Sequence, residues 1–136
     1  MVTDITVRDV GAYTAEDRSW YVGEHGHNIE INVPLDFTKF TGANFADGVV
    51  KSGCVLGKVT ATGSYGAYDP AATDGRQTAV CHLHSSFRIP ANTATVATAA
   101  GVVHANVKVP RLPYQSGAGA LDTAARTALR NVHYID

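Results

Sequence analysis

Residues 54–62 carry the clearest strand pattern in the chain. The segment is rich in valine and threonine, its apolar and polar residues alternate, and Gly53 and Gly63 bound it. β-branched side chains favour extended backbone and glycines favour turns, so the pattern predicts a core β-strand. A strand must pair its backbone groups with another strand, which makes a sheet the first structural expectation for this chain.

Shorter segments on both sides show the same alternation. Ile29, Ile31 and Val33 face one way between polar neighbours, which predicts a half-buried strand. We expect Pro34 to end this strand or to place it at a sheet edge, because proline lacks a backbone N–H. Turn-forming residues are densest at 63–76. Further strands are predicted within 77–89, within 93–109 and at 132–135.

One segment near the C-terminal end has helical periodicity. Asp122 is placed to cap its first turn, and Arg126 and Arg130 lie toward its end, where the helix dipole favours cations. These features predict a mostly β domain with one late helix. The apolar residues that recur three or four positions apart are Leu121, Ala125, Ala128, Leu129 and Val132.

Size and charge exclude several classes of protein. The 136 residues suit one domain, and with 45% hydrophobic residues they can bury a core without a disulfide or a metal. Only 17% of residues are charged and the net charge is −1, which argues against nucleic-acid binding and against a polybasic membrane surface. The apolar stretches are too short for a membrane span, and the first residues lack the pattern of a secretion signal.

The cysteines and histidines were the first candidates for chemistry. Cys54 and Cys81 are expected to be free thiols that behave as small buried hydrophobes, with a disulfide left open as the alternative. His82 and His84 share one face of a predicted strand, a spacing that can chelate a transition metal, and His25-x-His27 repeats it.

No acidic residue completes a metal signature beside these pairs. The favoured interpretation is that His82 and His84 are surface or interface residues beside a buried Cys81, and that the chain has no metal site and no cofactor. Neither a spaced carboxylate pair nor a phosphate loop is present, because Asp69 and Asp74 are placed as turn formers. The sequence therefore predicts a protein that is not an enzyme.

Aromatic residues stand beside glycine and aspartate at several positions. Trp20, Tyr21 and Tyr68 are examples, and aromatic side chains near turns suit protein contacts. Stacking on sugars or bases is the less favoured interpretation, because basic partners are missing. We expect a protein that packs against copies of itself or against another protein.

Two neighbouring segments resemble the phage head decoration proteins related to the lambda protein D family. They are residues 52–60, which read SGCVLGKVT, and residues 65–79, which read YGAYDPAATDGRQTA. The likeness is weaker before residue 35 and continues downstream in Val102–Ala105, Leu121–Ala125 and Val132–Ile135. Cys81 stands where the family pattern has glycine, and His82–His84 stand where it has aliphatic residues.

The resemblance implies a fold and a division of the chain. The fold is mainly β (α+β), a small β-barrel or β-tulip-like domain with one short C-terminal helix. Residues 29–136 would form this domain, and residues 1–28 would form an extended N-terminal arm. Strand addition is one way in which an alternating arm can bind another protein, and its apolar anchors would be Val2, Ile5, Val7 and Val10.

The resemblance also implies a virion protein, made in the cytoplasm of the host bacterium. It would bind the major capsid protein as a homotrimer on the outer surface of the expanded head and brace the head against DNA pressure. Nucleic acid and membranes are not expected partners. The alternative is a small β-domain that binds a metal through His82 and His84, or a glycan at Trp20 or Tyr68. Candidate trimer contacts are Tyr65, Tyr68, Pro70, Pro113 and Tyr114.

Overall fold

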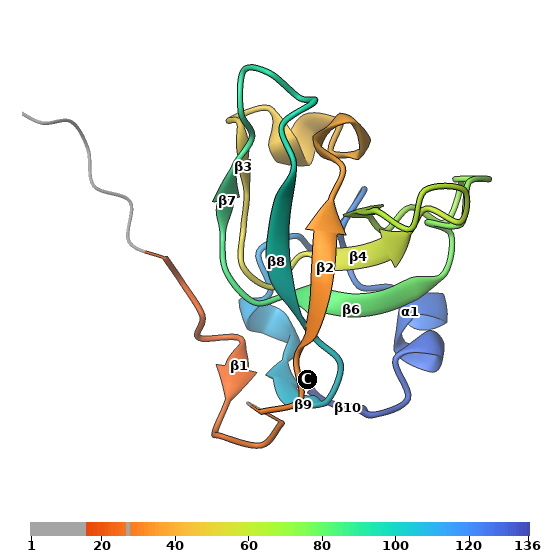
Figure 1. The fold of residues 1–136 in the computed structure, drawn as a ribbon. Helices are drawn as coiled ribbons and strands as arrows, with labels where there is room; N and C mark the ends of the chain where they lie inside the picture. Colours follow the sequence, from red (N-terminus) through yellow and green to blue (C-terminus); the bar gives the residue numbers. More distant parts are fainter. Residues whose placement is uncertain (1–15, 27) are drawn as a thin grey trace, which may run out of the picture.

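Five short strands close into a barrel in the computed structural model, which describes residues 16–26 and 28–136 (Figure 1). Each strand of the barrel is antiparallel to its neighbours except where β2 meets β5. In barrel order they are β2 (Ile31–Leu35), β5 (Tyr65–Ala67), β4 (Val55–Lys58), β6 (Ala79–Leu83) and β8 (Ala97–Val102).

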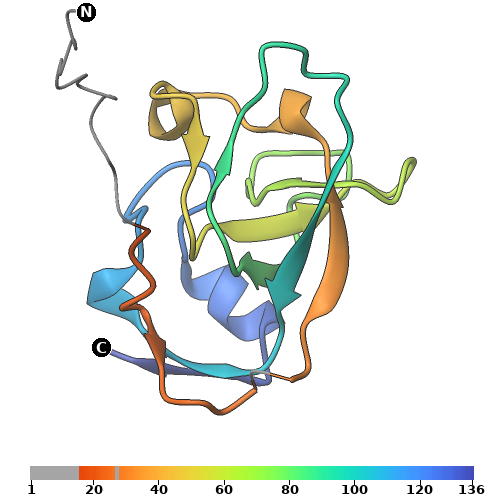
Figure 2. The ribbon, with the colours of Figure 1, turned by 60° about the vertical axis from the view of Figure 1, so that its left-hand side comes forward.

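A three-stranded sheet lies across one end of the barrel (Figure 2). Its central strand β9 (Ala105–Lys108) pairs antiparallel with β1 (Tyr21–Val22) and parallel with β10 (Val132–Ile135). A separate two-stranded sheet joins β3 (Val49–Val50) and β7 (Phe87–Arg88). The helices are η1 (Phe37–Lys39), η2 (Ala43–Phe45), η3 (Val109–Arg111) and α1 (Thr123–Ala128). The predicted class, mainly β with one short helix near the C-terminus, is confirmed.

Strands β4 and β6 are covered on both faces. Successive residues of a strand point to opposite sides, so Leu56 and its partner Cys81 face the inside of the barrel while Val55 and its partner His82 face outward. The inward residues belong to the barrel core. Val55 belongs to a second core on the other side of the barrel wall. The three-stranded sheet, called the outer sheet from here on, contributes residues such as Val107, and Leu129 enters this core directly after α1. The middle of the molecule is therefore a three-layer arrangement.

A pair of glycines brings a long turn onto the barrel wall. Gly57 and Gly66 face each other across β4 and β5. A Cβ atom on Gly57 would lie 2.6 Å from the Cα atom of Arg76, so the turn rests directly on the strand. Arg76 donates to the carbonyl of Ala67 and to the carboxylate of Asp74, at 3.2 and 3.0 Å. The residues that resemble decoration proteins over 65–79 therefore hold this turn against the barrel.

Residues 16–26, the second half of the segment expected to form an arm, lie against the domain. Trp20 is fully buried and its indole N–H donates to the Ser52 hydroxyl at 3.0 Å. Ser52 in turn donates to the carbonyl of His84 at 2.6 Å. The Trp20 carbonyl accepts from the N–H of Lys108 at 2.8 Å, which leads the chain into β1. Residues 1–15, which include all four predicted anchors, lie outside the described residues.

Some predicted boundaries differ from the structure, and the strand expected over residues 54–62 covers only Val55–Lys58 as β4. Of the two expectations for Pro34, the end of the strand was wrong, because β2 continues through Pro34 to Leu35. Asp36 donates its N–H to Tyr65 on β5, so the nitrogen of Pro34, two residues earlier, faces the same side. On that side β2 pairs only at Leu35, and proline removes no hydrogen bond to β8.

The helix is shorter than its periodicity indicated. It ends at Ala128, and Val132 already begins β10. Its predicted cap is confirmed, because the Asp122 carboxylate accepts from the N–H of Ala125 at 2.8 Å. The same carboxylate accepts from the hydroxyl of Tyr68, so the start of the helix is tied to the barrel as well.

Replacing Gly57 with alanine tests the contact between the turn and the barrel. The new methyl group would push against the Arg76 backbone, so Gly57→Ala should lower the free energy of unfolding by about 1–3 kcal/mol. Chemical denaturation with guanidinium measures the change. Thr98→Ala, at an exposed position of β8, is the control and should change it by no more than about 0.5 kcal/mol. A Gly57→Ala protein as stable as wild type would contradict the packing described here.

Candidate functional site

Within residues 16–26 and 28–136, no group of three histidine, cysteine, aspartate or glutamate side chains is placed to hold a metal ion. The predicted turn formers Asp69 and Asp74 accept hydrogen bonds from the backbone two residues ahead, at Ala71 and Arg76. Both carboxylates therefore hold the local turn, as the sequence indicated.

His82 is a core residue, and the expectation that it lies at the surface was wrong. Its ring has no exposed surface and stacks on Trp20, with ring centroids 5.5 Å apart. Nδ1 lies 2.9 Å from the carbonyl oxygen of Gly53, and Nε2 lies 2.8 Å from the hydroxyl of Tyr134. A carbonyl only accepts, so Nδ1 carries the hydrogen and the Tyr134 hydroxyl donates to Nε2. Both ring nitrogens are thus occupied by protein groups.

His84 does not join His82 in a chelate. Its Nδ1 lies 3.1 Å from the hydroxyl of Ser85, and its ring meets Tyr21 edge-on at 6.1 Å. The alternative of a metal held by His82 and His84 would require His82 to leave both Gly53 and Tyr134. Burial also lowers the pKa of His82 to about 4, against the opposing effect of the Gly53 hydrogen bond, so the ring is neutral near pH 7.

Both cysteines are buried free thiols, as the sequence predicted. Burial raises the pKa of Cys81 to about 12 and raises that of Cys54 further. A buried thiol that stays protonated is a poor nucleophile. Cys54 and Cys81 therefore contribute to the barrel core and offer no reactive group to solvent.

The aromatic residues singled out in the sequence are mostly internal. Trp20 and Tyr68 are at most 1% exposed, so neither ring offers a face on which a sugar could stack. Tyr65 and Tyr114 are also buried, while Pro70 is exposed and Pro113 is half-buried. Both rings fill the core between the barrel and the outer sheet, which the sequence pattern did not indicate.

The structure brings together the two loops that carry the predicted trimer contacts. Gly119 donates its N–H to the carbonyl of Tyr68 at 2.8 Å, which joins the 110–120 loop to the 63–76 turn. An open depression of about 260 Å³ lies between them, lined by Pro70 on one side and by residues such as Ser116 and Ala118 on the other. Trimer contacts at these positions remain a prediction.

A larger open groove, of about 870 Å³, lies where the described chain begins. Residues 16–19 form one wall, the β3–β7 ribbon forms a second, and the 110–113 segment forms a third. We call this surface the root groove. Its lining residues are Glu16, Asp17, Ser19, Asp47, Val49, Lys51, Ser52, Ser86, Phe87, Arg88, Pro110, Arg111, Leu112 and Pro113.

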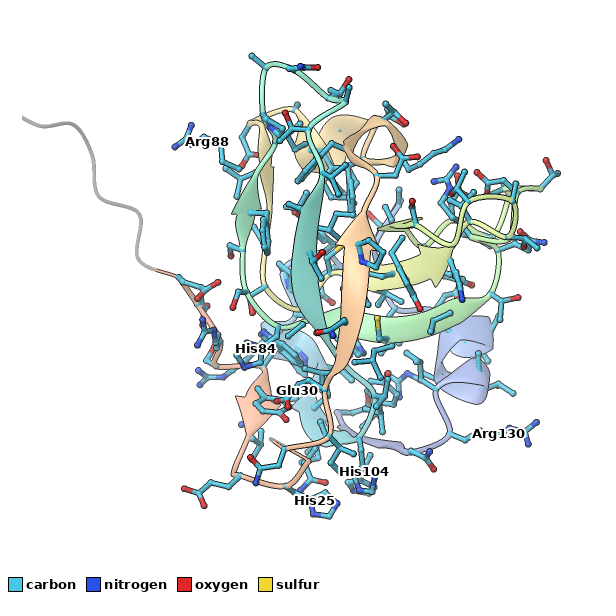
Figure 3. All side chains as sticks on the ribbon, in the orientation of Figure 1. His25, Glu30, His84, Arg88, His104 and Arg130 are labelled. Atoms are coloured by element: carbon cyan, nitrogen blue, oxygen red, sulfur yellow. The ribbon has the colours of Figure 1, made fainter. Side chains whose placement is uncertain are left out.

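Contacts of Glu16 fix one wall of the root groove, and charges of both signs line the groove. Glu16 accepts from the N–H of Ser86 and pairs with Arg18, so the start of the described chain is fastened beside β7. Arg88 extends from β7 away from the barrel (Figure 3). The charged lining residues are Glu16, Asp17 and Asp47 on the acidic side, and Lys51, Arg88 and Arg111 on the basic side. Such a surface suits a protein partner with charges of both signs.

The root groove could not be found from sequence patterns, because its walls come from three separate segments. Pro113 is the one lining residue that the sequence analysis named as a candidate site residue, and there as a trimer contact. A search for long apolar helices finds no candidate membrane span in the described part of the chain.

Comparison with protein families gives one match. Residues 33–134 match the family described as bacteriophage lambda head decoration protein D. The match begins within β2 and ends within β10, so it spans the barrel, α1 and two strands of the outer sheet. A search of curated proteins finds none that matches the chain.

The buried, neutral His82 makes stability depend on pH. Its pKa is about 4 in the folded chain and about 6.5 when exposed, so the unfolded chain binds the extra proton between these values. His82 should therefore reduce the free energy of unfolding as pH falls from about 6.5 to about 4, by at most about 1.4 kcal/mol per pH unit. Denaturation at several pH values measures the slope.

His82→Gln should flatten this slope, and His133→Gln, at an exposed position, should leave it unchanged. If His82→Gln does not fold, NMR titration of the wild-type ring gives the same information. A His82 pKa at or above its ordinary value would contradict the burial and hydrogen bonding described above.

Proposed function

The chain belongs to the family of the bacteriophage lambda head decoration protein D, and we propose that it binds the outer surface of an expanded icosahedral phage head as a homotrimer. In this role it stabilises the head against the pressure of the packaged DNA. The observation that carries the proposal is the family match over residues 33–134, which covers nearly all of the domain. The major capsid protein is the proposed partner, and no catalytic step, nucleic acid or membrane is involved.

The position of the root groove supports a particular orientation on the head. Residues 1–15 continue from Glu16, which lines this groove. We propose that these residues add as a strand to the major capsid protein, with Val2, Ile5, Val7 and Val10 as apolar anchors. A segment that leaves the domain at the root groove brings that groove toward the shell. The root groove is accordingly the proposed capsid-facing surface.

The root groove has two features that suit a protein partner. Among the described residues, β3 and β7 pair only with each other, so each has an edge without a strand partner. Such edges can accept a strand from another chain. The charged side chains that surround them, Lys51 and Arg88 among them, add charge complementarity to backbone pairing.

Trimer formation would increase the strength of attachment without strong single contacts. Three linked copies bind the shell at three places, and the later contacts form at a high effective concentration. The depression between Pro70 and the 115–118 segment is the proposed contact between copies, because it joins the two loops singled out for this role. The protein would be made in the cytoplasm of the host bacterium and would join the head after the shell expands.

Removing residues 1–15 should weaken attachment and leave the domain folded. The shortened protein should keep the thermal unfolding transition of the domain, because the described contacts of Trp20 and β1 remain. Its binding to expanded heads should fall by tenfold or more, measured by co-sedimentation. A full-length variant with serine at Val2, Ile5, Val7 and Val10 should also stay folded and should lose binding to expanded heads to a similar extent. Serine at Thr3 and Thr6 is the control, and undiminished head occupancy after the deletion would contradict the arm.

Reversing one charge in the root groove should weaken attachment selectively. Arg88→Glu changes an exposed side chain that lines the groove, whereas Arg130→Glu changes an exposed arginine beyond α1, in another part of the molecule (Figure 3). We expect co-sedimentation with expanded heads to fall several-fold for Arg88→Glu and to stay unchanged for Arg130→Glu. Equal loss in both variants would indicate a general charge effect and would contradict the proposed orientation.

A further inference from the structure

Two histidine side chains meet at the end of the molecule where β1 turns back beside β9. His25 lies in the turn that follows β1, and His104 lies in the turn between β8 and β9. The Nε2 atoms of the two rings are in direct contact, and the ring centroids are 4.4 Å apart. Figure 3 shows the two side chains next to each other at this end. Neither belongs to the root groove or to the depression beside Pro70.

The backbone holds these two turns together. A Cβ atom on Gly26 would lie 1.6 Å from the carbonyl oxygen of His104, and Gly26 has a φ of +85°, so only glycine allows this approach. Close to both turns, the pairing of Val22 in β1 with Asn106 in β9 also holds the two segments together. The positions of His25 and His104 therefore follow from the fold, with His25 exposed and His104 half-buried.

The geometry points to a metal site. A neutral imidazole with its hydrogen on Nδ1 presents the Nε2 lone pair, and here two such atoms face the same point. Imidazole is a preferred ligand of zinc, nickel and copper. We propose that His25 and His104 together bind one divalent late transition-metal ion through Nε2. A small rotation of both rings would place each nitrogen about 2.0–2.1 Å from a zinc ion.

The remaining coordination positions would be taken by water or by a further side chain. An ion at this place would join the turn after β1 to the turn between β8 and β9. It would thereby fasten residues 16–26, which lie against the domain through Trp20, at their second end. The inference does not depend on the proposed function.

Zinc titration of protein purified without a histidine tag tests the site. Calorimetry and native mass spectrometry should find one zinc ion per chain. The ion binds the folded chain, so Tm should rise by roughly 3 °C or more at saturation. His25→Ala and His104→Ala should each abolish binding and the Tm shift, and should leave the Tm of the metal-free protein close to wild type. His84→Ala and His133→Ala are the matched controls and should bind as wild type does.

Two results would overturn the metal site. One is a wild-type chain that takes up no zinc, which would leave His25 and His104 as a hydrogen-bonded pair. The other is binding that survives either alanine substitution. NMR gives a test on the unchanged protein, because zinc should shift the imidazole resonances of His25 and His104 and leave that of His133 in place.

Discussion

The burial of β4 and β6 on both faces is the constraint on which the rest of the structure depends. A strand in that position cannot leave a polar group without a partner, because such a group would lose its hydrogen bonds to water. His82 meets this requirement with one ring nitrogen on Gly53 and the other on Tyr134. The bond to Tyr134 links the barrel wall to the last strand of the outer sheet, so the buried histidine joins the two layers.

The sequence predicted the type of structure well and the layers poorly. A strand within residues 54–62, the Asp122 cap and the closing strand at 132–135 all appear in the structure, because each depends on local backbone preferences. The first of these strands is shorter than its pattern, and covers Val55–Lys58. The alternation along 77–84 was interpreted as one buried and one exposed face. A second layer covers the outer face, and neighbouring residues alone could not show it because Trp20 and Tyr134 reach it from distant parts of the chain.

The candidate site likewise combines features that the sequence predicted with features that it could not predict. The family-like segment 65–79 was visible in the sequence, and the structure explains its glycines and Arg76 as parts of the barrel wall and of the turn that rests on it. Residues that identify the family therefore serve the fold. The root groove is made by three segments that meet only after folding, and its chemistry is spread over single charges such as Lys51 and Arg88. Surfaces of this kind carry no local sequence pattern.

The proposed orientation of the protein on the head can be observed directly. Cryo-electron microscopy of expanded heads incubated with the full-length protein would show where the domain lies and which surface meets the shell. We expect three copies around each occupied three-fold position, with the root groove and Glu16 toward the capsid protein and Arg130 away from this contact. Density for single copies, or for trimers whose root groove faces solvent, would contradict it.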